Sequence, residues 1–233
     1  IPIVQHLTLW ITFLGAALAA ASDRLLALST GSFLPDRWRT GVRVLTSAIG
    51  AAISVWLMLA SLDLVSVARE ARDIVAWGIP VWVAMSIMPA GFAALAGRLV
   101  WRAGESWLPR ALAAAGLAAP LVFSSLPTLQ ADRMLLPASI VILVAVALGM
   151  PIFAALGGAA LLMFWQEGVP AAAVPAETYH LASSPMLPAI PLFTLGGFLF
   201  SEGGAGQRLM RVFTALVGWM PGGLAIVTTL VLA

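Results

Sequence analysis

Residues Val44 to Leu62 read VLTSAIGAAISVWLMLASL, 19 consecutive residues without an acid or a base. About 20 apolar residues in a helix are enough to cross the hydrocarbon core of a membrane. Most of the remaining chain is made of six more charge-free windows: Ile1–Ser22, Ile74–Gly97, Ala111–Ala131, Met134–Gln166, Thr178–Ser201 and Val212–Ala233. This pattern predicts a polytopic helical membrane protein.

The composition supports this class and excludes several others. Of 233 residues, 61% are apolar and 9% are charged, whereas soluble domains have roughly 25% charged residues. All 12 basic residues are arginines, and they lie in short loops between apolar runs. Nucleic-acid binding would need a clustered basic face. The absence of cysteine from the sequence excludes disulfides, thiolate metal sites and cysteine nucleophiles.

We expect an all-α fold, a transmembrane bundle of about six spans, with an amphipathic interfacial helix and the start of a further span. The expected spans are Ile1–Ala21, Val44–Val67, Trp77–Val100, Ala111–Leu126, Leu135–Phe164 and Met186–Phe200. The fourth is short and is followed by Pro127. The fifth, about 30 residues, is either one kinked helix or two half-helices. Residues Trp165 to Pro185 are expected to form a loop.

The C-terminal part differs from a simple span. Leu209, Val212, Phe213 and Leu216 fall at i, i+3, i+4 and i+7, which is one apolar stripe on a short helix that would lie in the membrane interface. The stretch from 224 to 233 then opens a further span. The chain begins without methionine and stops inside an apolar run, so we expect an internal fragment of a longer protein.

The distribution of arginines predicts an orientation. Loops after the first and third spans contain seven: Arg24, Arg37, Arg39, Arg43, Arg98, Arg102 and Arg110. Loops after the second and fourth contain three: Arg69, Arg72 and Arg133. The positive-inside rule places the first set in the cytoplasm and Ile1 on the outer side. Beyond residue 134 the sides depend on whether the fifth segment crosses once.

Few ionisable side chains fall in or near the spans. Asp63 and Glu202 either have a functional role inside the membrane or lie at span ends, where Asp63 could reach headgroups and Glu202 would be a loop acid. At the end of the second span, Arg69 and Asp73 are four residues apart and could pair on a helix.

The two histidines do not predict a metal or haem site. His6 and His180 are far apart in sequence and neither has a second histidine at helical spacing. We expect His6 to face another helix and His180 to lie in a loop. No catalytic residue and no metal ligand is predicted.

Hydroxyl residues inside the spans are expected to bond to their own helix or to a neighbour. They are Thr12, Ser47, Ser54, Ser86, Ser139 and Thr194. None has the surroundings of an activated nucleophile.

Glycine-rich positions recur in the second half of the chain. They are Gly149-Met150-Pro151, Gly157-Gly158, Gly196-Gly197 and Gly222-Gly223. Such positions either break helices, exposing backbone groups to ions and substrates, or serve as kinks and close packing points in a rigid scaffold.

Several of these motifs resemble a known family. Ala189 to Gly204 (AIPLFTLGGFLFSEGG), Arg208 to Val227 (RLMRVFTALVGWMPGGLAIV) and Leu148 to Leu162 (LGMPIFAALGGAALL) resemble the start of the large, DctM-type permease of tripartite ATP-independent periplasmic (TRAP) transporters. Phe13 to Ala19 (FLGAALA), Gly31 to Pro35 (GSFLP) and Gly78 to Ala90 (GIPVWVAMSIMPA) resemble the small, DctQ-type permease. The order resembles the fused permeases of the family.

The resemblance implies a cation-coupled, usually sodium-driven, importer of small organic anions in a bacterial inner membrane. It implies a periplasmic solute-binding protein, the rest of the large permease and the lipid bilayer as partners, and no cofactor. Residues 1–107 would be a small-permease region lacking its first helix, 108–133 a connecting span, and 134–233 the N-terminal part of the large permease. Substrate-binding residues are expected beyond Ala233, so this part would be mostly scaffold.

Two alternatives remain from other classes. A membrane anchor of a redox or respiratory complex would need histidines paired for haem or quinone contacts. An intramembrane enzyme would need a nucleophile with a base at a suitable spacing.

Overall fold

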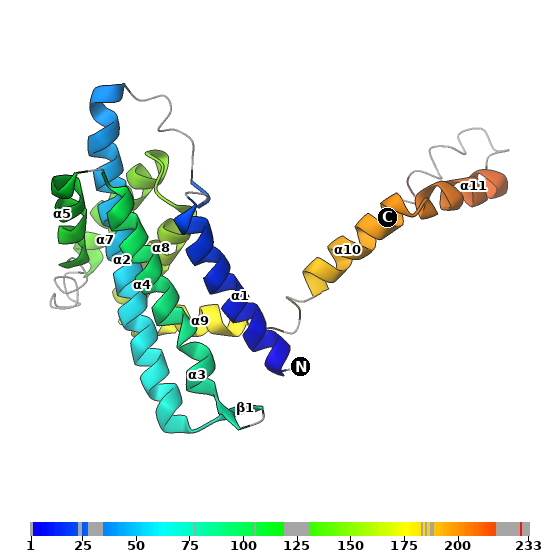
Figure 1. Cartoon of the computed structure of the whole chain (residues 1–233), viewed down its shortest axis with the longest axis horizontal. Coiled ribbons are helices and arrows are strands. Elements are labelled where there is room, and N and C mark those ends of the chain that lie inside the picture. Colours follow the sequence, from blue (N-terminus) through cyan, green and yellow to red (C-terminus); the bar gives the residue numbers. More distant parts are fainter. Residues whose placement is uncertain are drawn as a thin grey trace. The chain divides into compact units, whose positions relative to one another are not determined.

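The computed structural model describes residues 2–22, 25–27, 35–76, 78–104, 106–118, 131–182, 184, 186, 189–217 and 229. The chain divides into two compact units, residues 1–184 and 185–233, and each is described by itself. Helices account for most of the described residues (Figure 1). The expected all-α class is confirmed, apart from one small hairpin.

Three helices form the main bundle of the first unit: α1 (Pro2–Ala21), α2 (Asp36–Ala71) and α4 (Ile87–Arg102). Helix α2 lies along α4, and α4 packs on α1 (Figure 1). The rings of Phe13 on α1 and Phe92 on α4 meet edge to face with centroids 5.1 Å apart, an arrangement that favours an aromatic pair beyond its buried area.

Small polar residues are buried along one face of α2. Ser47, Ser54 and Ser61 follow one another at intervals of seven and are all buried. The hydroxyl of Ser54 donates to the Gly50 carbonyl at 2.8 Å, and that of Ser61 donates to the Leu57 carbonyl at 2.6 Å. Because the hydroxyls of Ser54 and Ser61 are satisfied on their own helix, they can be buried without a polar partner on another helix.

Helix α2 is longer than the expected span of Val44 to Val67. Its 36 residues correspond to about 54 Å, well beyond a hydrocarbon core of about 30 Å. No glycine-proline break interrupts the chain between Pro35 and Arg72, where the helix ends in a left-handed residue with φ of 58°. The charged residues at both ends therefore continue the helix instead of ending it.

The connection from α2 to α4 contains a small hairpin that the sequence did not indicate. Strand β1 (Ile74–Ala76) pairs antiparallel with β2 (Ile79–Pro80), and the Val81 amide donates to the Asp73 carbonyl at 2.9 Å. Helix α3 (Val81–Met85) follows and is separated from α4 at Ser86. The expected third span is thus a hairpin followed by a helix pair.

The described part of the expected fourth span is helix α5 (Trp107–Ala115) and the 3₁₀ turn η2 (Gly116–Ala118), both packed on α2. The nine residues of α5 correspond to about 14 Å, less than a membrane crossing. The remainder of that expected span, 119–126, lies outside the described residues.

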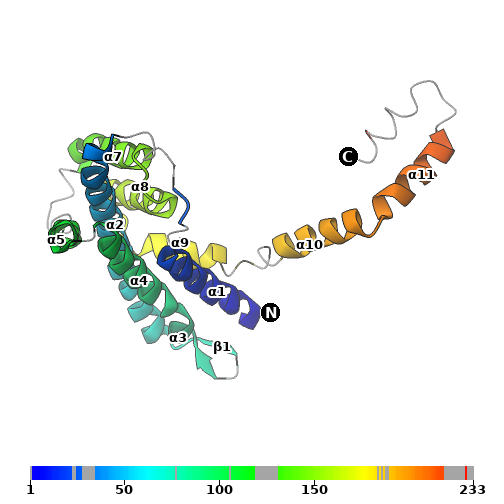
Figure 2. The ribbon, with the colours of Figure 1, turned by 45° about the horizontal axis from the view of Figure 1, so that its top comes forward.

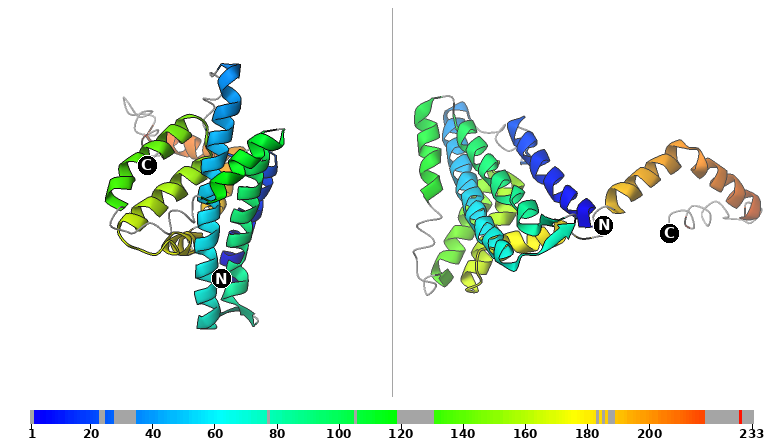
Figure 3. Two further views of the ribbon diagram at one scale, coloured as in Figure 1. Left: turned by 90° about the vertical axis from the view of Figure 1, so that its left-hand side faces the viewer. Right: turned by 60° about the horizontal axis from the view of Figure 1, so that its bottom comes forward.

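The expected fifth span is two helices, α7 (Ala131–Ala147) and α8 (Ile152–Gln166). They turn back on one another and lie side by side (Figure 3). A prediction of a loop over Trp165 to Pro185 is wrong, because helix α9 (Ala173–Ala182) occupies its centre. Pro175 falls in the first turn of α9, where a missing amide hydrogen breaks no helical hydrogen bond.

The second unit contains α10 (Ala189–Glu202) and α11 (Ala205–Val217). They are joined by a turn at Gly204, whose φ is 68°. The interfacial helix expected from the apolar stripe corresponds to α11, on which Arg208 and Arg211 are exposed. The turn at 219–223 and the further span expected after it, including Gly222-Gly223, lie outside the described ranges, apart from residue 229.

Two described helical segments are long and apolar enough to cross a membrane by length and composition, Trp38–Ala71 and Val81–Arg102. Shorter apolar segments are His6–Ala21, Leu135–Ala147, Ile152–Gln166 and Leu192–Glu202. Membrane helices are therefore plausible, and the number of spans stays a prediction.

Candidate functional sites

The break at Gly149-Met150-Pro151 is a tight turn between α7 and α8. Gly149 has a φ of 98°, a conformation that favours glycine. Its amide donates to the Val146 carbonyl at 2.9 Å, and the Met150 amide donates to the Ala145 carbonyl at 2.8 Å. This pair of bonds is a Schellman motif, which satisfies the last carbonyls of α7.

The turn is held by the segment that follows α1. Ala27 and Pro151 form an isolated antiparallel bridge, and the Ile152 amide donates to the Leu26 carbonyl at 2.9 Å. Met150 is completely buried. The backbone groups of this turn are therefore used in protein contacts, which favours a structural role over exposure to a transported ion.

Helix α8 approaches α2 at its tandem glycines. A Cβ added at Gly157 would lie 2.8 Å from Cδ1 of Leu57, and one added at Gly158 would lie 2.6 Å from Cδ1 of Ile53. Gly157-Gly158 is thus a close packing point within a continuous helix. Gly196-Gly197 is also inside a helix, α10, but nothing lies within 4 Å of a Cβ built at either position.

A polar contact joins α1 to α9. Nε2 of His6 lies 2.8 Å from the Tyr179 hydroxyl, and Figure 2 shows α9 beside α1. Burial raises the pKa of the Tyr179 phenol above its ordinary value of 10.0. The expectation that His6 faces another helix is confirmed. The expectation that His180 lies in a loop is wrong, because it is on α9.

The two acids singled out in the sequence are both exposed. Asp63 is on α2, and Glu202 is the last residue of α10. The position of Glu202 favours the simpler interpretation of a helix-terminal acid. Asp63 lies within α2, which continues to Ala71. Among the residues that the structure describes, no group of three or more His, Cys, Asp or Glu side chains could hold a metal ion.

Hydroxyl groups in the described helices bond mainly to their own backbone, as expected. Thr12, Ser54, Ser86, Ser139 and Thr194 donate to carbonyls three or four residues earlier at 2.7 to 2.9 Å. Ser47 is buried. These bonds leave the hydroxyls in structural roles.

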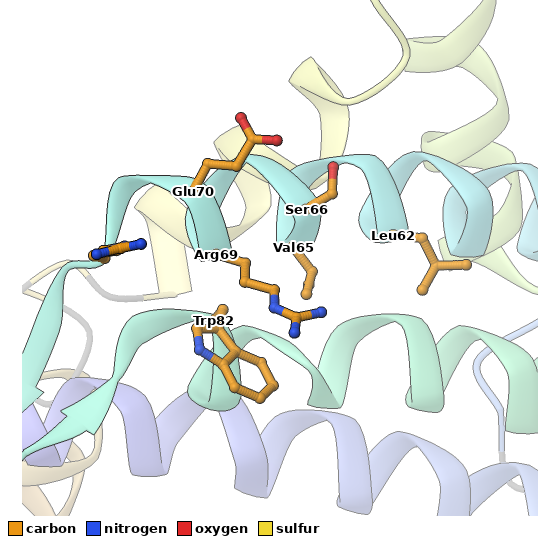
Figure 4. A pocket seen from close by; sticks show the side chains of 7 residues that line it. Leu62, Val65, Ser66, Arg69, Glu70 and Trp82 are labelled. Atoms are coloured by element: carbon orange, nitrogen blue, oxygen red, sulfur yellow. The ribbon is translucent and has the colours of Figure 1, made fainter.

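An open groove of about 690 Å³ lies beside the C-terminal end of α2. Its walls are formed by Leu62, Val65, Ser66, Arg69, Glu70, Arg72 and Trp82. The Arg69 guanidinium lies over the Trp82 ring, 5.7 Å from its centroid, and Figure 4 shows it extending from α2 toward α3. Pairing of Arg69 with Asp73 on the helix does not occur, because α2 ends at Ala71. Arg69 instead makes a cation–π contact.

Comparison with known proteins identifies two regions. Residues 1–108 match the family described as tripartite ATP-independent periplasmic transporters, DctQ component. Residues 139–233 match the DctM component of the same transporters. Both components are membrane proteins, so the matches and the apolar helices together define a transporter permease. The chain belongs to the TRAP transporter family, as a fused permease with its DctQ region before its DctM region.

A curated relative supports this assignment. The chain is 38% identical over 80 residues to the C4-dicarboxylate TRAP transporter large permease protein DctM of Vibrio cholerae. The match covers 34% of this chain and 18% of the relative. No solved structure matches the chain.

Proposed function

We propose that the chain is part of the permease of a sodium-coupled secondary transporter that imports small organic acids into bacteria. A periplasmic solute-binding protein would deliver the substrate, and the permease would cross the inner membrane several times. The observation that carries the proposal is the presence of both TRAP membrane components in one polypeptide. The Vibrio cholerae relative, named as a C4-dicarboxylate transporter component, favours carboxylates as the substrate class.

Within this permease, the first unit would act as scaffold. Among its described residues, the buried polar side chains are Thr46, Ser47, Ser54 and Ser61, and three of them donate to carbonyls of their own helix. Each of these three hydroxyls has used its only hydrogen, so it cannot also donate to a carboxylate. We therefore propose that the substrate ligands lie elsewhere, beyond Ala233 as expected from the resemblance. The division into 1–107, 108–133 and 134–233 is part of the same proposal.

Transport in reconstituted vesicles tests the proposal. The complete reading frame that encodes this chain is inserted into proteoliposomes, and uptake of radiolabelled succinate is measured with the cognate binding protein outside. Uptake should require both an inward sodium gradient and the binding protein. Uptake that is unchanged in potassium-only buffer would refute the coupling ion. Uptake without the binding protein would refute the delivery step.

The other two functional classes are less well supported. The matches to transporter components do not favour a redox anchor, and they point to a permease that is not an enzyme. A featureless haem spectrum of the purified protein would agree with this, whereas a haem Soret band would require the redox hypothesis to be reconsidered.

A further inference from the structure

The C-terminal end of α2 separates its charges onto two faces. Leu62, Val65 and Arg69 fall at i, i+3 and i+7, so they share one face of the helix. Asp63 and Glu70 fall seven residues apart on a different face. In Figure 4, Leu62, Val65 and Arg69 are directed toward α3, whereas Glu70 is directed away from it. The groove therefore presents the Arg69 guanidinium on the side of α2 that faces α3, while Glu70 lines the groove from another side of the helix.

The same groove changes from apolar to cationic along the helix. Leu62 and Val65 line one part, and Arg69 and Arg72 line the part nearer the helix end. Seven residues of helix correspond to about 10 Å, which is enough to reach from the hydrocarbon edge through the headgroup region, about 5–8 Å on each side of a bilayer. Tryptophan side chains favour this level of the membrane, and Trp82 lines the groove.

We propose that this groove binds the headgroup of an anionic glycerophospholipid. The guanidinium groups of Arg69 and Arg72 bind the phosphodiester, because planar guanidinium donors match phosphate oxygens and form charge-assisted hydrogen bonds. Leu62, Val65 and the Trp82 ring contact the glycerol and the first acyl carbons. A small dicarboxylate would leave this apolar part of the groove empty, so a lipid is the better fit. The inference does not depend on which substrate is transported.

The absence of cysteine from the sequence allows a probe to be placed at the groove alone. Any cysteine that the complete protein carries outside this chain is first replaced by serine. The resulting protein with Ser66→Cys is labelled with bimane and reconstituted into phosphatidylcholine vesicles that contain brominated phosphatidylglycerol or brominated phosphatidylcholine. Ser66 lines the groove and is exposed. A second protein with Val67→Cys carries the label at the same height on another exposed position, 63% exposed.

We compare the concentration of each brominated lipid that quenches half of the bimane fluorescence at position 66. For brominated phosphatidylglycerol this concentration should be lower than for brominated phosphatidylcholine, by about fivefold for each arginine that binds the headgroup. The preference should disappear in the Arg69→Gln/Arg72→Gln variant. At Val67 the two lipids should quench equally. Glu70→Gln should raise the preference for phosphatidylglycerol at Ser66 about twofold, because one repulsive carboxylate is removed. If the substitution only damaged the groove, the preference for phosphatidylglycerol would be lost.

Equal quenching by the two lipids at Ser66 would overturn the proposal, and so would a preference that survives removal of both arginines. Reversal of the phosphatidylglycerol quenching by added succinate would also overturn it, since the groove would then be a carboxylate site.

Discussion

Replacing Gly158 with alanine tests how α8 packs on α2. The added Cβ would lie 2.6 Å from Cδ1 of Ile53 and 3.1 Å from Cδ1 of Ile142, whereas carbon atoms in favourable contact are about 3.5–4.0 Å apart. Side chains on two helices must therefore both shift. Such overpacking costs about 1–3 kcal/mol, and the helix-propensity gain of alanine over glycine offsets about 1 kcal/mol. We expect a net loss of about 0–2 kcal/mol in the free energy of unfolding.

A matched control isolates the packing cost. Gly97 also lies inside a helix of the first unit, and nothing lies within 4 Å of a Cβ built there. Gly97→Ala therefore receives the propensity gain without the clash, so the two variants should differ by about 1–3 kcal/mol. The assay is equilibrium unfolding of the purified protein in mixed micelles by sodium dodecyl sulfate, followed by helical circular dichroism.

A second substitution tests whether Cδ1 of Ile53 causes the clash with the new methyl group at position 158. Ile53→Val removes Cδ1, the atom nearest the new methyl group, and alone should cost about 0.5–1.5 kcal/mol. Combined with Gly158→Ala it should relieve the clash, giving a favourable coupling energy of about 1–2 kcal/mol. The reasoning is refuted if Gly158→Ala is as stable as Gly97→Ala, or if the two substitutions at positions 53 and 158 are simply additive.

Two further predictions concern contacts that join distant parts of the chain. Burial raises the pKa of Tyr179 in the folded state above 10.0. The neutral phenol therefore contributes fully to the free energy of unfolding below pH 10.0, and this contribution is lost as the pH rises through the folded-state pKa. Tyr179→Phe should abolish this loss. Tyr179 is the single tyrosine of this chain, and the tyrosinate absorbance that the variant lacks reads its pKa; a midpoint at or below 10.0 would contradict the burial. Cysteines at Ala27 and Pro151, paired in an antiparallel bridge, should be within disulfide range and cross-link on mild oxidation, whereas Ala27 with Met163, near the other end of α8, should not. Equal cross-linking of both pairs on denaturing gels would argue against the bridge.

The apolar windows were a good guide to where helices lie and a poor guide to where they end. Charged residues such as Arg39 and Arg69 marked the ends of the expected second span, yet both are inside α2, because arginine is itself a good helix former. The window pattern reports where a helix can be buried in lipid, and it contains no information on how far the helix continues into water. Helix α9 was missed for a related reason, since alanine and proline suggested a loop although Pro175 fits a first helical turn.

The glycine motifs could be recognised from the sequence, but their roles could not be separated. Gly149 requires a positive φ and ends a helix, whereas Gly158 is a contact point inside one. The role of Gly158 depends on which helix lies opposite, and that information is not local. The same limit applies to His6, which was expected to face a helix. Its partner, Tyr179, is 173 residues away, and no spacing rule connects them.

The boundary between the two transporter components does not coincide with the boundary between the structural units. The DctM match begins at residue 139, yet the first unit continues to residue 184. Helix α8 contacts Ile53 and Leu57 of the DctQ region through its glycines, and α9 contacts α1 through Tyr179. The first DctM helices thus share a core with the DctQ region, and this shared core includes Met150, Ala154 and Leu161. Close helix packing is the main source of stability inside a membrane, so the fusion joins two components that already form one packed body up to α9. The DctM residues from α10 onward form a unit of their own.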